Sequence, residues 1–176
     1  MVTTISKEQI AAFPTATFPG RIIVIQTEKE AIKAVNYLSQ YKELGFDTET
    51  RPSFRKGQSH KISLIQLSTE DTCFLFRVNL IDIPECLSQL LINTQIIKIG
   101  LSLKDDFSAI RKRKSLSLDG FIDLQSYVRN FGIEDSSLQR IYAILFAEKI
   151  SKGQRLSNWD APILSEAQQK YAALDA

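Results

Sequence analysis

The sequence predicts an α/β domain in which a mixed β-sheet is flanked by helices. Short apolar segments typical of strands crowd the first hundred residues of the 176-residue chain, whereas most later segments have helical periodicity. Two apolar segments, 61–68 and 72–78, are separated by the turn-like sequence TED, which predicts an antiparallel hairpin. With 44% apolar and 24% charged residues, the chain suits one domain with a full hydrophobic core.

An arm, a strand and a helix are expected at the start of the chain. Residues 1–20, which include FPTATFPG, are expected to form an extended arm before a domain that comprises 21–176. The β-branched run at 21–26 predicts a strand, and Thr27 is a favourable N-cap for a helix that continues to about residue 40. Apolar and polar residues alternate in ELGFDTET, which predicts the next strand at 43–50.

Later segments alternate between strand and helix patterns and then become mostly helical. A polar loop follows the second strand, and the hairpin comes next. Ser165 and Gln168 have the spacing of a capping box, which predicts the start of a final helix. The other expected elements are a short helix at 83–91, a buried strand at 95–100, a segment at 121–128 that fits either state, and an amphipathic helix at 136–146.

Charge and composition limit the possible functions. The net charge of +2 is too small to indicate a nucleic-acid or membrane partner by itself. The sequence has no signal peptide and no apolar run of membrane-spanning length, so a cytoplasmic location is expected. Cys73 and Cys86 lie in apolar sequence and are expected to be buried free thiols. The only histidine, His60, excludes a multi-histidine metal site.

Two carboxylates occupy the strand predicted at 43–50, where acidic residues are unusual. Side chains alternate between the two faces of a strand, so Leu44 and Phe46 point one way while Asp47 and Glu49 point the other. Two negative charges on one face of a core strand repel each other. Their presence there calls for a function.

A third carboxylate lies beside the apolar face of a predicted helix. Ser102 is expected to cap this helix, with Asp105 as the acidic partner of a capping box. The apolar stripe consists of Leu103, Phe107 and Ile110. Asp105 points away from this stripe, and the helix dipole accounts for its position at the helix start. Asp106 lies next to the stripe, and capping does not explain it.

The final helix contains a fourth unexpected carboxylate. Tyr171 and Asp175 are four residues apart and therefore share the helix face that should be packed. Asp175 also lies at the helix C-terminus, where the helix dipole disfavours an anion. The sequence stops one residue later, so the carbonyl groups of the last turn are expected to lack partners.

The four carboxylates predict a metal site if they converge in space. Buried unpaired carboxylates cost several kcal/mol or become protonated, and bound divalent cations would offset this cost. Hard oxygen ligands select Mg²⁺ or Mn²⁺. Two such ions about 3.5–4 Å apart can flank a phosphodiester. The alternative is that some of these carboxylates are solvated surface groups at the ends of elements.

Three sequence motifs resemble those of the ribonuclease D-like 3′–5′ exonucleases. They are FDTET, IGLSLKDDFSAI and YAALDA, in the order and spacing of the three exonuclease motifs of the DEDD superfamily. The third motif is of the tyrosine type, as in ribonuclease D and the exonuclease domain of the Werner syndrome helicase. The similarity extends from about Arg21 to the end of the sequence.

The resemblance implies a ribonuclease H-like fold and release of nucleoside 5′-monophosphates from a 3′ end by two-metal-ion hydrolysis. It implies that Asp47 bridges two divalent cations, Mg²⁺ or Mn²⁺. Glu49 and Asp175 would complete the site of the ion that carries the nucleophilic water. Asp106 would support the second ion through water, and Tyr171 would orient the attacking water.

The resemblance also implies a nucleic acid with a single-stranded 3′ end, either DNA or RNA, as substrate. Its expected contacts lie next to the first motif and in the basic loop after it: Thr48, Thr50, Arg51, Phe54, Arg55 and Lys56. The basic run RKRK at 111–114 could also contact phosphates. A solvated basic surface is the alternative reading of both segments.

One departure leaves a second function open. The last helix of the family usually continues beyond the third-motif aspartate, so this domain is expected to be cut short at its C-terminal helix. The alternative function is therefore a nucleic-acid-binding module with an exonuclease-like fold that no longer cuts. The complete set of four carboxylates favours the enzyme.

Overall fold

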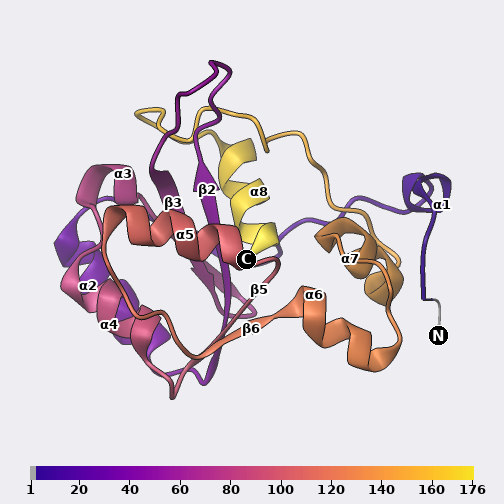
Figure 1. The fold of residues 1–176 in the computed structure, drawn as a ribbon, viewed down its shortest axis with the longest axis horizontal. Helices are drawn as coiled ribbons and strands as arrows, with labels where there is room; N and C mark the ends of the chain where they lie inside the picture. Colours follow the sequence, from indigo (N-terminus) through magenta and orange to yellow (C-terminus); the bar gives the residue numbers. More distant parts are fainter. Residues whose placement is uncertain (1–2) are drawn as a thin grey trace.

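A computed structural model describes residues 3–176, whose strands form one mixed six-stranded sheet (Figure 1). The strand order across the sheet is β1-β4-β3-β2-β5-β6. β3 runs antiparallel to β2 and β4, and the other neighbours are parallel. The strands are β1 (Arg21–Ile25), β2 (Glu43–Thr50), β3 (Ile62–Ser68), β4 (Thr72–Phe76), β5 (Ile97–Gly100) and β6 (Phe121–Asp123).

Helices cover both faces of this sheet. In Figure 1, α2, α4 and α5 lie together on one side of the sheet, α8 lies on the other, and α6 and α7 lie farther out. The helices are α1 (Lys7–Ala11), α2 (Glu28–Leu38), α3 (Val78–Ile81), α4 (Glu85–Ile92), α5 (Lys104–Arg113), α6 (Leu124–Tyr127), α7 (Leu138–Phe146) and α8 (Glu166–Asp175), with a 3₁₀ turn at Val128–Phe131. The predicted mixed sheet flanked by helices is confirmed.

Each face of the sheet has its own apolar core. The larger core contains Leu44 and Phe46 of β2 together with apolar residues of α2, α4 and α5. The smaller core joins Leu64 of β3 and two residues of β4 to Ala172 and Ala173 of α8. Because strand residues alternate between faces, these two cores separate the apolar residues of β2 from its carboxylates.

Most of the predicted elements are confirmed. β3 and β4 form the expected antiparallel hairpin. Thr27 and Ser165 cap α2 and α8 through capping boxes. The segment 121–128, which fitted either a strand or a helix, contains both: β6 ends at Asp123 and α6 follows. The Asp123 side chain caps α6 by accepting a hydrogen bond from the Gln125 amide.

The predicted extended arm at 1–20 differs from the structure. Its residues 1–2 lie outside the described part of the chain, and Ser6 opens the short helix α1. The Ile5 amide donates to the Asp135 carboxylate, and the Ala16 amide donates to the Lys149 carbonyl. The arm therefore packs against the segment around α7.

Ser102 does not cap α5, contrary to the expectation from sequence. Leu103 is the N-cap residue and makes no side-chain capping bond, while Ser102 has a positive φ of 57°. The Asp123 carboxylate accepts from the backbone amides of both residues, at 2.9 and 3.0 Å. A carboxylate at the end of β6 thus satisfies the free amides at the start of α5.

The two cysteines differ in their burial. Both thiols are free, as expected, but only Cys73 is fully buried, whereas Cys86 is partly exposed. Cys86 lies on the short helix α4, where part of its side chain reaches the surface.

Within residues 3–176, every helix is too short or too polar to cross a membrane.

The C-terminal end of α8 is fixed against the sheet. The hydroxyl of Ser68 donates to the Ala176 carbonyl at 3.0 Å, so this carbonyl has a partner that sequence analysis did not foresee. Gly45 of β2 lies below the same residue, and an added Cβ there would come within 2.5 Å of the Ala176 main chain. A side chain at position 45 would therefore displace the end of α8.

We expect Gly45→Ala to destabilise the protein by about 1–3 kcal/mol, because the backbone of the helix end must move to make room. Thermal unfolding of the purified variant measures this loss. Gly153→Ala is the matched control, since its added Cβ would make only an ordinary contact 3.4 Å from Ser151. Equal melting temperatures for the two variants would contradict the expected clash.

Candidate active site

Three carboxylates converge where β2 passes beneath the end of α8. One oxygen from each of Asp47, Glu49 and Asp175 lies within 4.8 Å of the others. Glu49 is buried, while Asp47 and Asp175 are partly exposed. The strand contributes two residues from one face, and the helix contributes the third from its last turn.

The segment before α8 is anchored so that the helix meets this part of β2. The Ser63 hydroxyl of β3 donates to Asp160 at 2.7 Å. The buried Arg77 guanidinium donates to the carbonyls of Ala161 and Pro162. Trp159 is fully buried in the smaller core, together with Ala172 and Ala173 of α8. These contacts determine where Asp175 lies.

Burial raises the pKa of every carboxyl in the cluster, and repulsion by neighbouring charges adds to this effect at Asp47 and Glu49. Burial, followed by the neighbouring charges, raises the pKa of Asp47 well above its ordinary value and that of Glu49 to about 8. Burial also raises the pKa of Asp175 to about 6, although a hydrogen bond from Tyr171 acts in the opposite direction. Ionised carboxylates are therefore unfavourable here unless a cation accompanies them.

Asp106 lies beside the cluster rather than within it. It is placed by α5, and its carboxylate accepts a hydrogen bond from the Thr48 hydroxyl of β2. Burial raises the pKa of Asp106 to about 6, and the hydrogen bond from Thr48 partly opposes this. Its charge contributes to the raised pKa of Asp47 and Glu49, so the four carboxylates interact electrostatically.

Tyr171 lies one helical turn before Asp175 on α8. Its ring contacts the indole of Trp159, with ring centroids 6.1 Å apart. Burial, together with the nearby Asp175 and Glu49, raises the pKa of the Tyr171 phenol far above its ordinary value. The phenol is therefore neutral at physiological pH, where it can donate a hydrogen bond but cannot act as a base.

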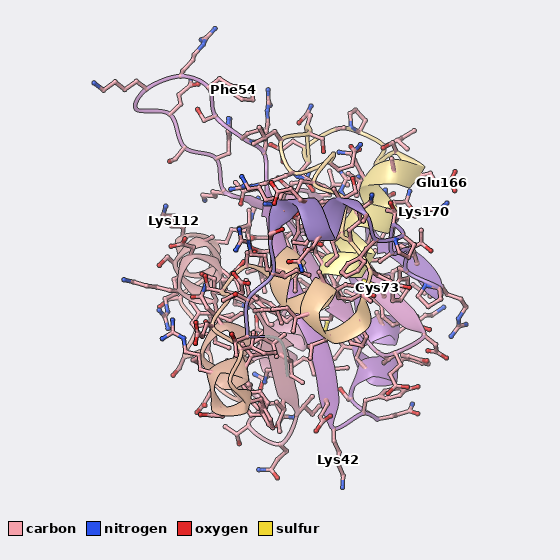
Figure 2. All side chains as sticks on the ribbon, turned by 90° about the vertical axis from the view of Figure 1, so that its right-hand side faces the viewer. Lys42, Phe54, Cys73, Lys112, Glu166 and Lys170 are labelled. Carbon is pink, nitrogen blue, oxygen red and sulfur yellow. The ribbon has the colours of Figure 1, made fainter. Side chains whose placement is uncertain are left out.

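The predicted substrate contacts differ in their exposure. Phe54 is 81% exposed and, in Figure 2, lies on a loop that projects away from the helices and sheet. Arg51, Arg55 and Lys56 of this loop are also exposed. Thr50 is partly buried at the β-bulge that ends β2. The Thr48 hydroxyl is committed to Asp106.

Half of the basic run at 111–114 makes contacts within the protein. Arg113 donates to the Ile62 carbonyl at 2.8 Å, and Lys114 pairs with Glu85 at 3.1 Å. Arg111 and Lys112 remain exposed, and Figure 2 shows Lys112 at the surface. Only these two side chains are available to a phosphate backbone.

A cavity of about 390 Å³ adjoins the carboxylate cluster and reveals two residues that sequence analysis missed. Asp47, Tyr171 and Asp175 line it, and so do Lys152 and Arg155 from the loop before α8. The Arg155 charge lowers the pKa of Glu49, against the effect of burial. The spacing of Lys152 and Arg155 was the available signal, but no local pattern links these two residues to Asp175, about 20 residues later.

The family follows from a comparison with known proteins. Residues 22–176 match the family model described as 3′-5′ exonuclease. The chain belongs to the 3′–5′ exonuclease family. The resemblance seen in the three sequence motifs and the predicted enzyme class are thereby confirmed.

Two curated relatives are similar to this chain in sequence, and one solved structure is similar in fold. A 3′-5′ exonuclease of Arabidopsis thaliana is 27% identical, with 93% of this chain and 62% of the relative covered. The bifunctional 3′-5′ exonuclease/ATP-dependent helicase WRN of Mus musculus is 31% identical over 79% of this chain and 10% of that protein. RNase D of Escherichia coli superposes with a TM-score of 0.78 at 20% identity, covering 89% of this chain and 41% of that one.

These comparisons establish the fold. The six-stranded sheet and its helices have the ribonuclease H-like exonuclease arrangement, as the motifs implied. The chain spans less than two-thirds of the length of the two curated relatives.

Proposed function

We propose that the protein is a metal-dependent exonuclease that removes nucleoside 5′-monophosphates from the 3′ end of a nucleic acid by two-metal-ion hydrolysis. The observation that carries this proposal is the convergence of Asp47, Glu49 and Asp175 beside a cavity that also contains Lys152 and Arg155. Anionic oxygens placed next to cationic side chains suit a phosphodiester that is held by metal ions on one side and by the protein on the other.

The donor set fits Mg²⁺ or Mn²⁺. All of the converging ligand atoms are hard carboxylate oxygens, and Asp175 Oδ1 is buried without a hydrogen-bond partner. We assign Asp47, Glu49 and Asp175 to one cation, and Asp47 with Asp106 to the second. When bound, the cations supply a nucleophile at neutral pH and stabilise the charge that develops on the phosphate.

The other residues bind and orient. The raised pKa keeps the Tyr171 phenol protonated, so that it donates a hydrogen bond beside Asp175 and orients the attacking water. Lys152 and Arg155 bind the phosphates of the substrate. The exposed loop residues Arg51, Arg55 and Lys56 contact the preceding nucleotides, and Phe54 stacks on a base.

Removing the Arg155 charge should weaken substrate binding more than the chemical step. We expect Arg155→Ala to raise KM about tenfold, which corresponds to one lost charge-assisted contact. The slope of the logarithm of the binding constant against the logarithm of the salt concentration should become shallower by about one, because one fewer phosphate is neutralised. Steady-state kinetics with an oligonucleotide at several salt concentrations measure both effects. Lys170→Ala, at an exposed cation of α8, is the matched control. An unchanged KM for Arg155→Ala would remove this residue from the proposed site.

A digest of 5′-labelled single-stranded oligonucleotides tests the function itself. DNA and RNA are incubated in parallel with Mn²⁺, Mg²⁺ or EDTA. A metal-dependent ladder that shortens from the 3′ end supports the proposal and reveals the sugar preference. Retention of uncut oligonucleotide by the folded protein would instead favour the non-catalytic binding module. The cytoplasmic location stays a prediction.

A further inference from the structure

We propose that Gln66 is a positioning residue for the carboxylates of Asp47 and Asp175, an inference that rests on the proposed metal site. Gln66 lies in the middle of β3 and is fully buried. In the register of the sheet it is directly opposite Asp47 on β2 and Leu75 on β4. Directly opposite residues of antiparallel strands point to the same face and lie side by side, so the Gln66 side chain neighbours that of Asp47.

The end of α8 covers this position. On the same face of β3, Leu64 packs with Ala172 and Ala173 of α8, and the Ser68 hydroxyl donates to the Ala176 carbonyl. Gln66 lies between Leu64 and Ser68 in the strand, so the last turns of α8 pass over it. Asp175 belongs to these turns. The amide of Gln66 is therefore enclosed between the two elements that carry the metal ligands.

Several hydrogen-bonding atoms at this position have no partner within residues 3–176. Gln66 Nε2 and Oε1 and Asp175 Oδ1 account for three of the four buried side-chain polar atoms that lack a partner in residues 3–176. A buried amide without partners is unfavourable, and methionine would fill the same space without this cost. Packing alone gives no reason for glutamine at this position.

A bound cation would create a need for a hydrogen-bond donor at the position of the Gln66 amide. An ionised carboxylate that uses one oxygen for the metal needs a donor for its other oxygen, and such donors fix the orientation of the ligand. The fourth carboxylate, Asp106, already receives a hydroxyl donor from Thr48. The Gln66 amide is the corresponding donor for the side of the site where β2 meets α8, and it donates to the carboxylates that hold the metal.

Gln66→Met tests this role because the amide is removed while side-chain length is retained. We expect the metal-free variant to melt at the parental temperature or above it, and its dissociation constant for Mn²⁺, measured by calorimetry, to rise at least tenfold. A residue that only supports packing would give the opposite pattern, with a lower melting temperature and unchanged Mn²⁺ affinity. That pattern would overturn the proposal.

Two controls keep the comparison specific. Leu75→Met alters the other cross-strand neighbour of Gln66 and should leave Mn²⁺ affinity within twofold of the parent. Gln168→Met removes a buried amide that already donates to Ser157 and Asn158, so it should lower the melting temperature. If the parent itself binds no Mn²⁺, both the metal site and this inference fail. If the parent and Gln66→Met bind it equally, only this inference fails.

A spectroscopic experiment on the parent protein does not depend on any variant. The side-chain amide resonances of Gln66 are followed during titration with diamagnetic Mg²⁺. We expect its proton resonances to move downfield in proportion to metal occupancy, as they do when an amide gains a charged acceptor. Resonances that stay fixed while Mg²⁺ binds would overturn the proposal.

Discussion

Asp47→Asn is expected to abolish nuclease activity while it stabilises the metal-free protein. Asp47 belongs to the three-carboxylate cluster and is assigned to both cations, so its loss removes several kcal/mol of transition-state stabilisation. Since each 1.36 kcal/mol corresponds to a tenfold change in rate, kcat should fall about 10³-fold or more. The labelled-oligonucleotide digest measures this fall, and Asp47→Ala should behave in the same way.

The stabilising effect follows from the same electrostatics. Burial and the charges of Glu49, Asp106 and Asp175 all disfavour the ionised form of Asp47. An uncharged amide of nearly the same shape removes this repulsion, so the melting temperature in EDTA at pH 8 should rise.

Glu43→Gln provides the matched control for Asp47→Asn, because it removes one charge from the exposed start of the same strand, outside the cluster. Activity and stability should both stay near those of the parent. Retained nuclease activity in Asp47→Asn would contradict the assigned site, and a lower melting temperature in EDTA would contradict the predicted repulsion.

Raising the pH from about 5 to about 8 should destabilise the metal-free protein. The pKa of Glu49 is raised from 4.5 to about 8 and that of Asp175 from 3.8 to about 6. In this range the folded protein retains protons that the unfolded chain has released, so the free energy of unfolding falls as the pH rises. The stabilisation from these two groups is fully present at pH values below their pKa in the unfolded chain. It is lost as the pH rises through their pKa in the folded protein.

The raised pKa values of Asp47 and Asp106 add to this slope, whereas the remaining shifted groups act mainly outside this pH range. The exposed carboxylates with lowered pKa, such as Glu30 and Asp71, reduce stability only when the pH falls to about 4.5 or below. Lys98, whose pKa burial lowers to about 8, adds stability with rising pH only above that value. The slope between pH 5 and 8 therefore reports on the three carboxylates of the cluster together with Asp106.

Urea unfolding in EDTA at several pH values measures this slope. Glu49→Gln should reduce it, because the variant has no proton to lose at this position. Saturating Mn²⁺ should reverse the sign, since the ion binds the ionised carboxylates of the folded state. A free energy of unfolding in EDTA that stays constant or rises between pH 5 and 8 would contradict the raised pKa values.

The sequence was sufficient to predict the fold and the faces on which the carboxylates lie, because these signals are local. Strand alternation placed Asp47 and Glu49 opposite Leu44 and Phe46, and the two apolar cores bear this out. Helical spacing likewise separated Asp106 from the exposed Asp105.

Contacts between distant segments could not be predicted in this way. Serine is a residue type that often caps helices, but the group that caps the start of α5 is the carboxylate of Asp123, at the end of β6. Lys152 and Arg155 lie in a loop whose path is determined by anchors on β3 and β4. The burial of Gln66 beside Asp47 depends on strand register, which a single sequence does not specify.

The bond between Ser68 and Ala176 has a consequence for folding kinetics. Its two residues are 108 positions apart, and α8 can join the sheet only after this long loop has closed. Docking then brings Asp175 against two carboxylates, which makes it a late and slow event. A cation that joins these carboxylates contributes after the transition state. It should therefore lengthen the lifetime of the folded protein and leave its folding rate nearly unchanged.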